Sequence, residues 1–337
     1  MKFENIVLRT GLNKFFCKKK ENNLIAFYDT SISSLNLGDQ IINSSGEKQL
    51  RTIFNNEQFY KISTHVGSKA IGISFSNMCK ERIVCGSNLL CDTMFRSANW
   101  YLSPLDILRM ETVVLMGVGW NKYSDNTTPI TKYFYNLLLN KTDRLHSVRD
   151  DYTKNKLNKL GFSNVINTGC PTMWGFTKDF CEKINHNKSD KVVFTLTDYD
   201  KDPHNDYLMI KKLKEQYSSV YFWPQGSKDL EYFNKFNVNN INILPPSLEA
   251  YDNLLENNSI DFIGTRLHAG IRALQYKRKS IIIAIDNRAI EKSKDFNLPI
   301  LLRNNIDSEL NDKIISDQKC KININEENII KWKEQFQ

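Results

Sequence analysis

Short apolar runs rich in β-branched and aromatic residues alternate with longer stretches of mixed polarity along the chain. Between Asn23 and Pro171 the runs read NLIAFYD, QFYKIST, RIVCGSN, TVVLMGVGW, LHSVRD and NVINTGCP. Runs of this kind predict strands, and the stretches between them are long enough for helices. The alternation therefore predicts an α/β layer architecture.

The same pattern restarts after the polar stretch EKINHNKSDK, residues 182–191. The later runs read VVFTLTDY, SVYFWPQG, NINILPPS, SIDFIGTR and SIIIAID, and helix-length segments such as 205–217 separate them. A length of 337 residues also favours more than one domain. We therefore expect two α/β domains, 1–187 and 188–337, with a ligand site in the cleft between them.

Composition and absent motifs limit the classes of function. The net charge of +8 comes from scattered lysines and not from a concentrated basic stripe, so we expect no nucleic-acid partner. No signal-peptide core or membrane-length apolar run occurs, and seven cysteines without a CxxC pair favour a reducing compartment, so we expect a cytoplasmic protein without a zinc site. The phosphate loop, the HExxH zinc motif and the GxSxG nucleophile elbow are also missing.

Charged residues stand where the predicted strand 259–264 gives way to a helix. Arg266 and His268 flank the apolar Leu267, and Thr265 is the expected N-cap of this helix. The first turn of a helix favours anions, a guanidinium matches carboxylate or phosphate, and an imidazole exchanges protons near neutral pH. The segment therefore predicts an anion site with an acid beside it. An arginine paired with a carboxylate and a histidine held by backbone groups are the structural alternative.

Two further strand ends carry the same kind of group. Arg149 and Asp150 follow the predicted strand LHSV, and Asp286 and Arg288 are expected on one face at the end of the strand SIIIAID. A structural ion pair is the alternative at both places.

A Gly-Asp pair near the amino terminus is a weaker signal of the same kind. Gly38 permits close backbone approach, and Asp39 either caps the following helix or accepts a hydrogen bond from a sugar hydroxyl. Capping is the ordinary role of an isolated aspartate in this position.

Five motifs in this order resemble the polysaccharide pyruvyl transferase family. They are GDQI (38–41), SVRD (147–150), GCPT (169–172), GTRLHAG (264–270) and AIDNR (284–288). The resemblance implies two Rossmann-like domains facing across a cleft, as in GT-B glycosyltransferases, with the acceptor on the amino-terminal side and phosphoenolpyruvate on the carboxyl-terminal side. It also implies transfer of a pyruvyl group from phosphoenolpyruvate to a sugar, which forms a pyruvate ketal and releases phosphate.

The resemblance also assigns residues and partners. His268 would be the general acid, with Arg149 and Arg266 as the other catalytic residues. Substrate binding is expected from Arg149, Arg266, Leu267, His268, Arg288, Gly38 and Asp39. Family members often carry lysine where Arg288 stands, which changes the geometry of phosphate contact. No metal or further cofactor is expected, because phosphoenolpyruvate is itself the donor substrate.

The acceptor and two alternative functions stay open at this point. The acceptor is expected to be a sugar or glycan of a surface polysaccharide or its precursor. If it is lipid-linked, the segment NKFFCKKK (13–20) would add weak peripheral contact with the membrane. The alternatives are a GT-B glycosyltransferase that uses a nucleotide sugar and an inactive glycan-binding protein on the same fold.

Overall fold

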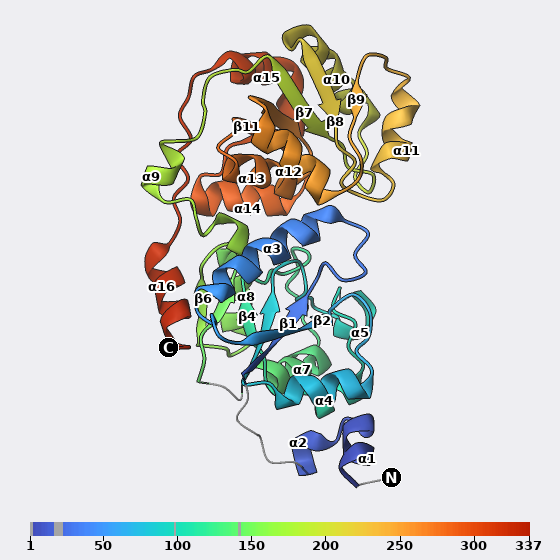
Figure 1. Cartoon of the computed structure of the whole chain (residues 1–337), viewed down its shortest axis with the longest axis vertical. Helices are drawn as coiled ribbons and strands as arrows, with labels where there is room; N and C mark the ends of the chain where they lie inside the picture. The colour runs from blue at the N-terminus through green and yellow to red at the C-terminus, as the bar shows by residue number, and fades with distance from the viewer. Residues whose placement is uncertain (1–2, 17–22, 98, 141–142) are drawn as a thin grey trace. The chain divides into compact units, whose positions relative to one another are not determined.

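The computed structural model describes residues 3–16, 23–97, 99–140 and 143–337, and the chain divides into two compact units (Figure 1). Unit 1 comprises residues 1–34, 42–171 and 325–337, and unit 2 comprises residues 35–41 and 172–324. Helix α3 (Leu37–Arg51) therefore begins in unit 2 and continues in unit 1. Among the described residues, no helix is long and apolar enough to cross a bilayer.

Unit 1 is built on parallel strands. The sheet order is β2-β1-β3-β4, and a bridge between Val118 and Val148 connects it to the pair β5-β6. The strands are β1 (Leu24–Asp29), β2 (Gln58–Ser63), β3 (Glu81–Cys85), β4 (Val114–Met116), β5 (His146–Val148) and β6 (Val165–Asn167). The helices are α1 (Phe3–Thr10), α2 (Asn13–Phe16), α4 (Ala70–Met78), α5 (Met94–Ser97), α6 (Pro104–Arg109), α7 (Pro129–Leu139), α8 (Asp151–Lys159) and α16 (Glu326–Glu334).

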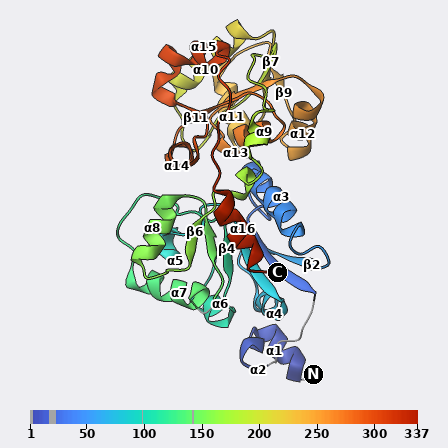
Figure 2. The same cartoon turned by 90° about the vertical axis from the view of Figure 1, so that its left-hand side faces the viewer.

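The last helix of the chain belongs to unit 1. Figures 1 and 2 show α16 beside β4 and β6, and two hydrogen bonds hold it there. Trp332 Nε1 donates to Leu115 O at 3.1 Å, and Asn328 Nδ2 donates to Asn167 O at 2.9 Å. Because the Trp332 side chain is fully buried, it anchors this helix to the sheet.

Unit 2 has one six-stranded parallel sheet with the order β12-β11-β10-β7-β8-β9. Its strands are β7 (Lys191–Thr195), β8 (Ser219–Phe222), β9 (Asn242–Ile243), β10 (Asp261–Gly264), β11 (Ser280–Ala284) and β12 (Ile300–Leu302). The helices are α9 (Lys178–Cys181), α10 (Pro203–Gln216), α11 (Asp229–Phe233), α12 (Leu248–Asn257), α13 (Leu267–Gln275), α14 (Asn287–Phe296) and α15 (Ile306–Ile315). The described residues also contain three 3₁₀ turns. These are η1 (Pro171–Met173), where the chain passes from unit 1 to unit 2, and η2 (Asn234–Phe236) and η3 (Arg303–Asn305) in unit 2.

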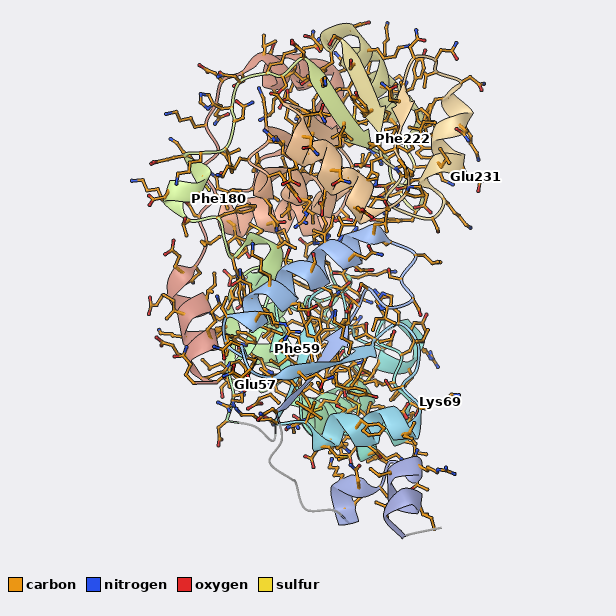
Figure 3. The ribbon with its side chains drawn as sticks, viewed as in Figure 1. Glu57, Phe59, Lys69, Phe180, Phe222 and Glu231 are labelled. Atoms are coloured by element: carbon orange, nitrogen blue, oxygen red, sulfur yellow. The ribbon has the colours of Figure 1, made fainter. Side chains whose placement is uncertain are left out.

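Helices cover both faces of the unit 2 sheet. On β11, Ile282 packs into one core with residues of α12, α13 and α14, whereas Ile281 and Ile283 pack into the other with residues of α10, α11 and α15. Phe222, which Figure 3 labels on β8, stacks on Phe233 of the second core at 4.3 Å between ring centroids. Burial on both faces explains why the sequence of β11 is a continuous apolar run.

The predicted strands and the α/β class are confirmed. Each of the eleven runs contains a strand, β12 is an addition, and two successive Rossmann-like units agree with the GT-B-like class. The units differ from the expected ranges 1–187 and 188–337, since the chain passes between them at Pro171 and returns at Asn325. The polar stretch 182–191 resembles a linker, yet Cys181 and Ile184 are buried in a core of unit 2. Membrane contact is expected for the segment 13–20, of which residues 17–20 lie outside the described residues.

Candidate functional site

The sheet of unit 2 has a switch point between β7 and β10. Three strands lie on the β7 side and three on the β10 side, which is the 3-2-1-4-5-6 order of dinucleotide-binding sheets. Ligands of such sheets bind beyond the carboxyl ends of the two strands at this point. Here those ends are Thr195 of β7 and Gly264 of β10, which are paired in register, and Arg266 follows immediately.

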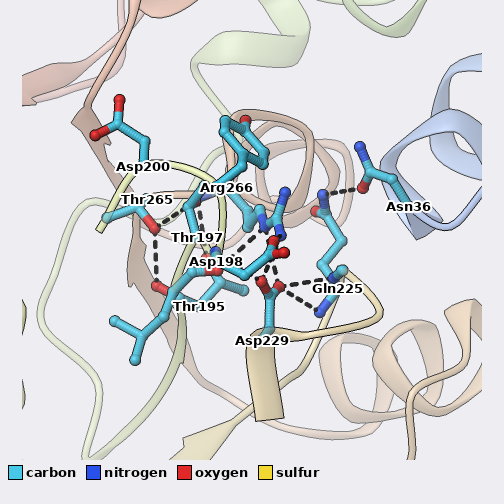
Figure 4. A network of polar contacts seen from close by, with 12 residues as sticks. Asn36, Thr195, Thr197, Asp198, Asp200, Gln225, Asp229, Thr265 and Arg266 are labelled. Carbon is cyan, nitrogen blue, oxygen red and sulfur yellow. Dashed lines mark hydrogen bonds and ion pairs between the residues drawn. The ribbon is translucent and has the colours of Figure 1, made fainter. Parts of the chain in front are cut away.

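Arg266 is held in a buried polar network that Figure 4 draws. Its Nε donates to Asp229 Oδ2 at 3.0 Å and to Leu196 O at 3.1 Å, and its Nη2 donates to Asp198 Oδ1 at 2.7 Å and also to Asp229 Oδ1. The residue is only 3% exposed. Among the described residues, the hydrogen bonds of this guanidinium come from Nε and Nη2 and none comes from Nη1. The structural alternative, an arginine paired with carboxylates, is therefore present.

A glycine makes room for this guanidinium. A Cβ atom at Gly226 would overlap Nη2 of Arg266 and would lie 3.0 Å from its Cζ. The fully buried Asp229 also accepts from the backbone N–H groups of Gly226 at 2.7 Å, Asp198 at 3.1 Å and Gln225 at 3.2 Å. Burial raises the pKa of Asp229 above its usual range, while Arg266 and the amide donors oppose that shift. The carboxylate and the guanidinium therefore depend on each other in this site.

The predicted GDQI motif lies next to the same network. Gln225 Nε2 donates to Asn36 Oδ1 at 2.7 Å (Figure 4). The Gly38 N–H donates to the same oxygen at 3.0 Å. A Cβ at Gly38 would stand 2.8 Å from Gln225 Nε2, so the close approach expected at this glycine is an approach to Gln225. Asp39 is buried in the first turn of α3.

Arg288 shares an aromatic neighbour with Arg266. The ring centroid of Tyr199 is 5.0 Å from Cζ of Arg266 and 5.8 Å from Cζ of Arg288, and Nη2 of Arg288 donates to the Tyr199 hydroxyl. Nε of Arg288 donates to Asp286 Oδ2 at 2.9 Å. Burial opposes the charge of Arg288, but Tyr199 and Asp286 hold its pKa above the ordinary value. The segments that follow β7, β10 and β11 thus bring two cations to one exposed tyrosine.

Two local expectations for this edge are wrong. Asp286 and Arg288 do not lie on a strand, because β11 ends at Ala284, Asp286 caps α14 and Arg288 lies in its first turn. Thr265 does not cap α13: the N-cap is Arg266, whose side chain makes no capping hydrogen bond. Thr265 instead extends the pairing of β10 with β7, since its N–H donates to Thr195 O at 3.2 Å.

The expected general acid lies in the first turn of α13. His268 is half-buried, and the neighbouring Leu267 is buried against the core under the helix. His268 and Arg266 are therefore two residues apart at the carboxyl edge of β10.

Arg149 occupies a similar setting in unit 1, at the carboxyl end of β5. Its Nε donates to Asp150 Oδ2 at 2.8 Å, its Nη2 donates to Trp120 O at 3.1 Å, and its Nη1 donates to Asn88. A Cβ at Gly119 would overlap the guanidinium, as at Gly226. The structural ion pair considered from the sequence is therefore present here too.

Comparison with known proteins identifies the family. The model of the polysaccharide pyruvyl transferase family matches residues 36–287. The chain belongs to this family. Four of the five motifs lie within the match and the fifth extends one residue beyond it, while no curated protein matches the sequence.

Several solved structures of low sequence identity align with most of this chain. The UDP-GlcNAc 2-epimerase of Methanocaldococcus jannaschii, in complex with UDP-GlcNAc and UDP, is 13% identical over 91% of this chain and 97% of its own, with a TM-score of 0.48. The epimerase of Neisseria meningitidis, bound to UDP-GlcNAc, is 11% identical over 93% and 100%, with a TM-score of 0.49. The wall teichoic acid polymerase TagF is 13% identical over 99% and 94%, with a TM-score of 0.45.

Sequence reasoning missed the residues that hold the arginines. Asp198 and Tyr199 follow β7, and Gln225 and Asp229 follow β8, far from Arg266 in the sequence. The available signal was the position of these polar residues at strand carboxyl ends in TLTDY and WPQGSKD. Their pairing with Arg266 depends on the strand order.

Proposed function

We propose that the protein transfers a pyruvyl group from phosphoenolpyruvate to a sugar of a surface glycan or its precursor, forming a pyruvate ketal and releasing phosphate. Membership of the pyruvyl transferase family supports the transferase class. The donor, the ketal product and the acceptor are part of the proposal. Since phosphoenolpyruvate is a cytoplasmic metabolite, the proposal also assigns the reaction to that compartment.

One observation carries the choice of donor. Arg266 and Arg288 both lie within 6 Å of the Tyr199 ring, at the carboxyl edge of the unit 2 sheet. Phosphoenolpyruvate has a carboxylate and a phosphate close together, and two fixed guanidiniums match such a pair of anionic groups. The ion pairs with Asp229 and Asp286 fix both guanidiniums before the ligand binds.

The reaction can be written with these residues in named roles. His268 gives a proton to the methylene carbon of phosphoenolpyruvate, and a sugar hydroxyl attacks the neighbouring carbon, which bears the carboxylate and the phosphate. The bond from this carbon to the phosphate oxygen then breaks, and a second hydroxyl of the same sugar closes the ketal. One hydroxyl proton replaces the proton that His268 gave, and the other leaves with phosphate. Arg266 and Arg288 stabilise the charge that develops on the departing phosphate.

The roles expected of Arg149, Leu267, Gly38 and Asp39 in substrate binding stay predictions. Asp39 is the proposed contact of the acceptor hydroxyl, and Arg149 is a further proposed contact of the donor. Membrane contact through residues 13–20 is proposed only for a lipid-linked acceptor.

Mass spectrometry of reactions with phosphoenolpyruvate and a panel of sugar, nucleotide-sugar and lipid-linked acceptors tests the proposal. We expect one acceptor to gain the mass of pyruvate less water, with release of one phosphate. The Arg288→Gln variant should form this product more slowly, whereas the matched change Arg278→Gln, on the turn after α13, should not. If no acceptor gains this mass while a nucleotide sugar is consumed, the proposed chemistry is wrong.

A nucleotide-sugar glycosyltransferase is the second candidate, because the strand order of unit 2 is that of nucleotide-binding sheets. Thermal-shift measurements separate the two, since a ligand that binds only the folded protein raises its melting temperature. Stabilisation by phosphoenolpyruvate favours the pyruvyltransferase, and stabilisation by nucleotide sugars alone favours the second candidate.

A further inference from the structure

A cavity lies at the edge of the unit 2 sheet opposite to Arg266 and Arg288. Its volume is about 320 Å³, and its lining includes Ser280, the first residue of β11, and Ile300, the first residue of β12. Arg266 and Arg288 follow the carboxyl ends of strands in the same sheet. Since parallel strands all begin at one edge of a sheet and end at the opposite edge, this cavity is distinct from the arginine site. It has room for about ten groups the size of a water molecule.

The lining of the cavity is cationic. It includes Lys279, Lys313, Lys319 and Lys321, and no aspartate or glutamate is found among the described residues that line it. The four lysines of the lining outnumber the nearby carboxylates of Asp261 and Asp317, and concave walls focus the positive potential that results.

The walls are fixed by hydrogen bonds from both sides. Lys279 Nζ donates to Ser316 O at 2.6 Å and to Ile314 O at 2.7 Å, and Asn297 Nδ2 donates to Lys321 O at 2.7 Å. These bonds hold the segment 316–321 against the sheet and α14. The cavity is therefore a built feature of unit 2 and not a gap beside a loose strand end.

Lys279 is the innermost cation. It is 8% exposed, and burial lowers its pKa; the carboxylates of Asp261 and Asp317 oppose this effect, and Lys188 adds to it. The neighbouring carboxylates thus offset only part of the effect of burial on this ammonium group. An anion in the cavity would stabilise the charged form.

We propose that this cavity binds a small molecule carrying a phosphate group. Lysines act as point charges that suit phosphate oxygens, and the cavity offers several of them but no arginine for bidentate carboxylate recognition. The volume suits a ligand the size of a phosphorylated monosaccharide. The inference is independent of the reaction assigned to the arginine edge.

Calorimetric titration with inorganic pyrophosphate at low ionic strength tests this site. All proteins carry Arg288→Gln, which weakens anion binding at the other edge of the sheet. Into this background we introduce Lys313→Gln, Lys319→Gln and Lys321→Gln together. The matched control replaces three exposed lysines of the same unit, Lys211, Lys214 and Lys235, by glutamine. Lys279 is kept, because it holds the backbone carbonyls of the cavity wall.

We expect the cavity triple variant to lose roughly tenfold or more in pyrophosphate affinity, and the control triple variant to keep the parent affinity. Circular dichroism spectra should be the same for the three proteins. Equal affinities in the two triple variants would overturn the proposal. The absence of titratable pyrophosphate binding by the parent at millimolar concentration would overturn it as well.

Discussion

Replacing Gly226 by alanine tests how the arginine edge is built. The added methyl group would overlap Nη2 of Arg266 and lie 3.1 Å from Asp229 Oδ1. A guanidinium at the end of a flexible side chain can usually move away at little cost. Here it is 3% exposed and bound to two carboxylates, so any movement breaks charged hydrogen bonds.

The size of the effect follows from those contacts. Loss of one charge-assisted hydrogen bond costs about 1.5–3 kcal/mol, and a buried carboxylate left without its partner costs about 3–5 kcal/mol. Asp229 keeps its three backbone donors, which moderates the loss. We therefore expect Gly226→Ala to destabilise unit 2 by about 2–5 kcal/mol, which corresponds to a lowering of its melting temperature by roughly 5–15 °C.

Differential scanning calorimetry measures the melting temperature of the variant, and calorimetric titration with phosphoenolpyruvate measures its affinity for the proposed donor. Gly175→Ala is the matched control in the same unit, since nothing lies within 4 Å of a Cβ there and its φ is not positive. We expect the control to be neutral or to stabilise by up to about 1 kcal/mol. Equal melting temperatures for the wild type and Gly226→Ala would refute the argument that Arg266 is fixed in place.

Three further predictions concern single side chains. His268→Gln should keep phosphoenolpyruvate binding in calorimetry but lose product formation by about 10²-fold, and near-normal turnover would remove it as the general acid. His146 is buried with Nδ1 accepting from the Leu115 N–H, and burial lowers its pKa to about 4. Because the histidine of the unfolded chain takes up a proton near pH 6.5, the free energy of unfolding should fall by about 2 kcal/mol between pH 7 and pH 5. Urea titrations at pH 7 and pH 5 measure this difference, and an equal free energy of unfolding at the two pH values would contradict it. Tyr199→Phe should weaken phosphoenolpyruvate binding less than Tyr199→Ala, because only the hydroxyl contact with Arg288 is lost, and equal affinities of both variants and the wild type would exclude the tyrosine from the site.

Local patterns were sufficient for the elements of the fold. The continuous apolar run SIIIA predicted a strand, and the alternation of such runs with helical segments predicted two α/β units. Local patterns failed at the ends of elements. The run SIIIAID did not indicate that the strand stops at Ala284 and that Asp286 caps a helix. An aspartate at this point is compatible with the last residue of a strand and with the N-cap of the next helix.

The boundary between the units also needed the tertiary structure. The polar stretch 182–191 has the composition of a linker, but Ile184 is 4% exposed and packs into unit 2. The final helix joins unit 1 through Trp332, more than 200 residues after the Leu115 carbonyl that it contacts. Composition describes how polar a segment is, whereas these contacts depend on which distant surface covers its few apolar side chains.

For the site, the sequence by itself determined which cations stand near strand ends and that a histidine follows one of them. Only the tertiary structure decided that Arg266 pairs with Asp229 and Asp198, which are 37 and 68 residues away, and that it shares Tyr199 with Arg288. Those pairings follow from the order β8-β7-β10-β11 in the sheet. Hydrophobic periodicity predicts that a strand is buried but carries no information about which strand lies beside it, so the partners of each charged loop were set by the packing of the whole unit.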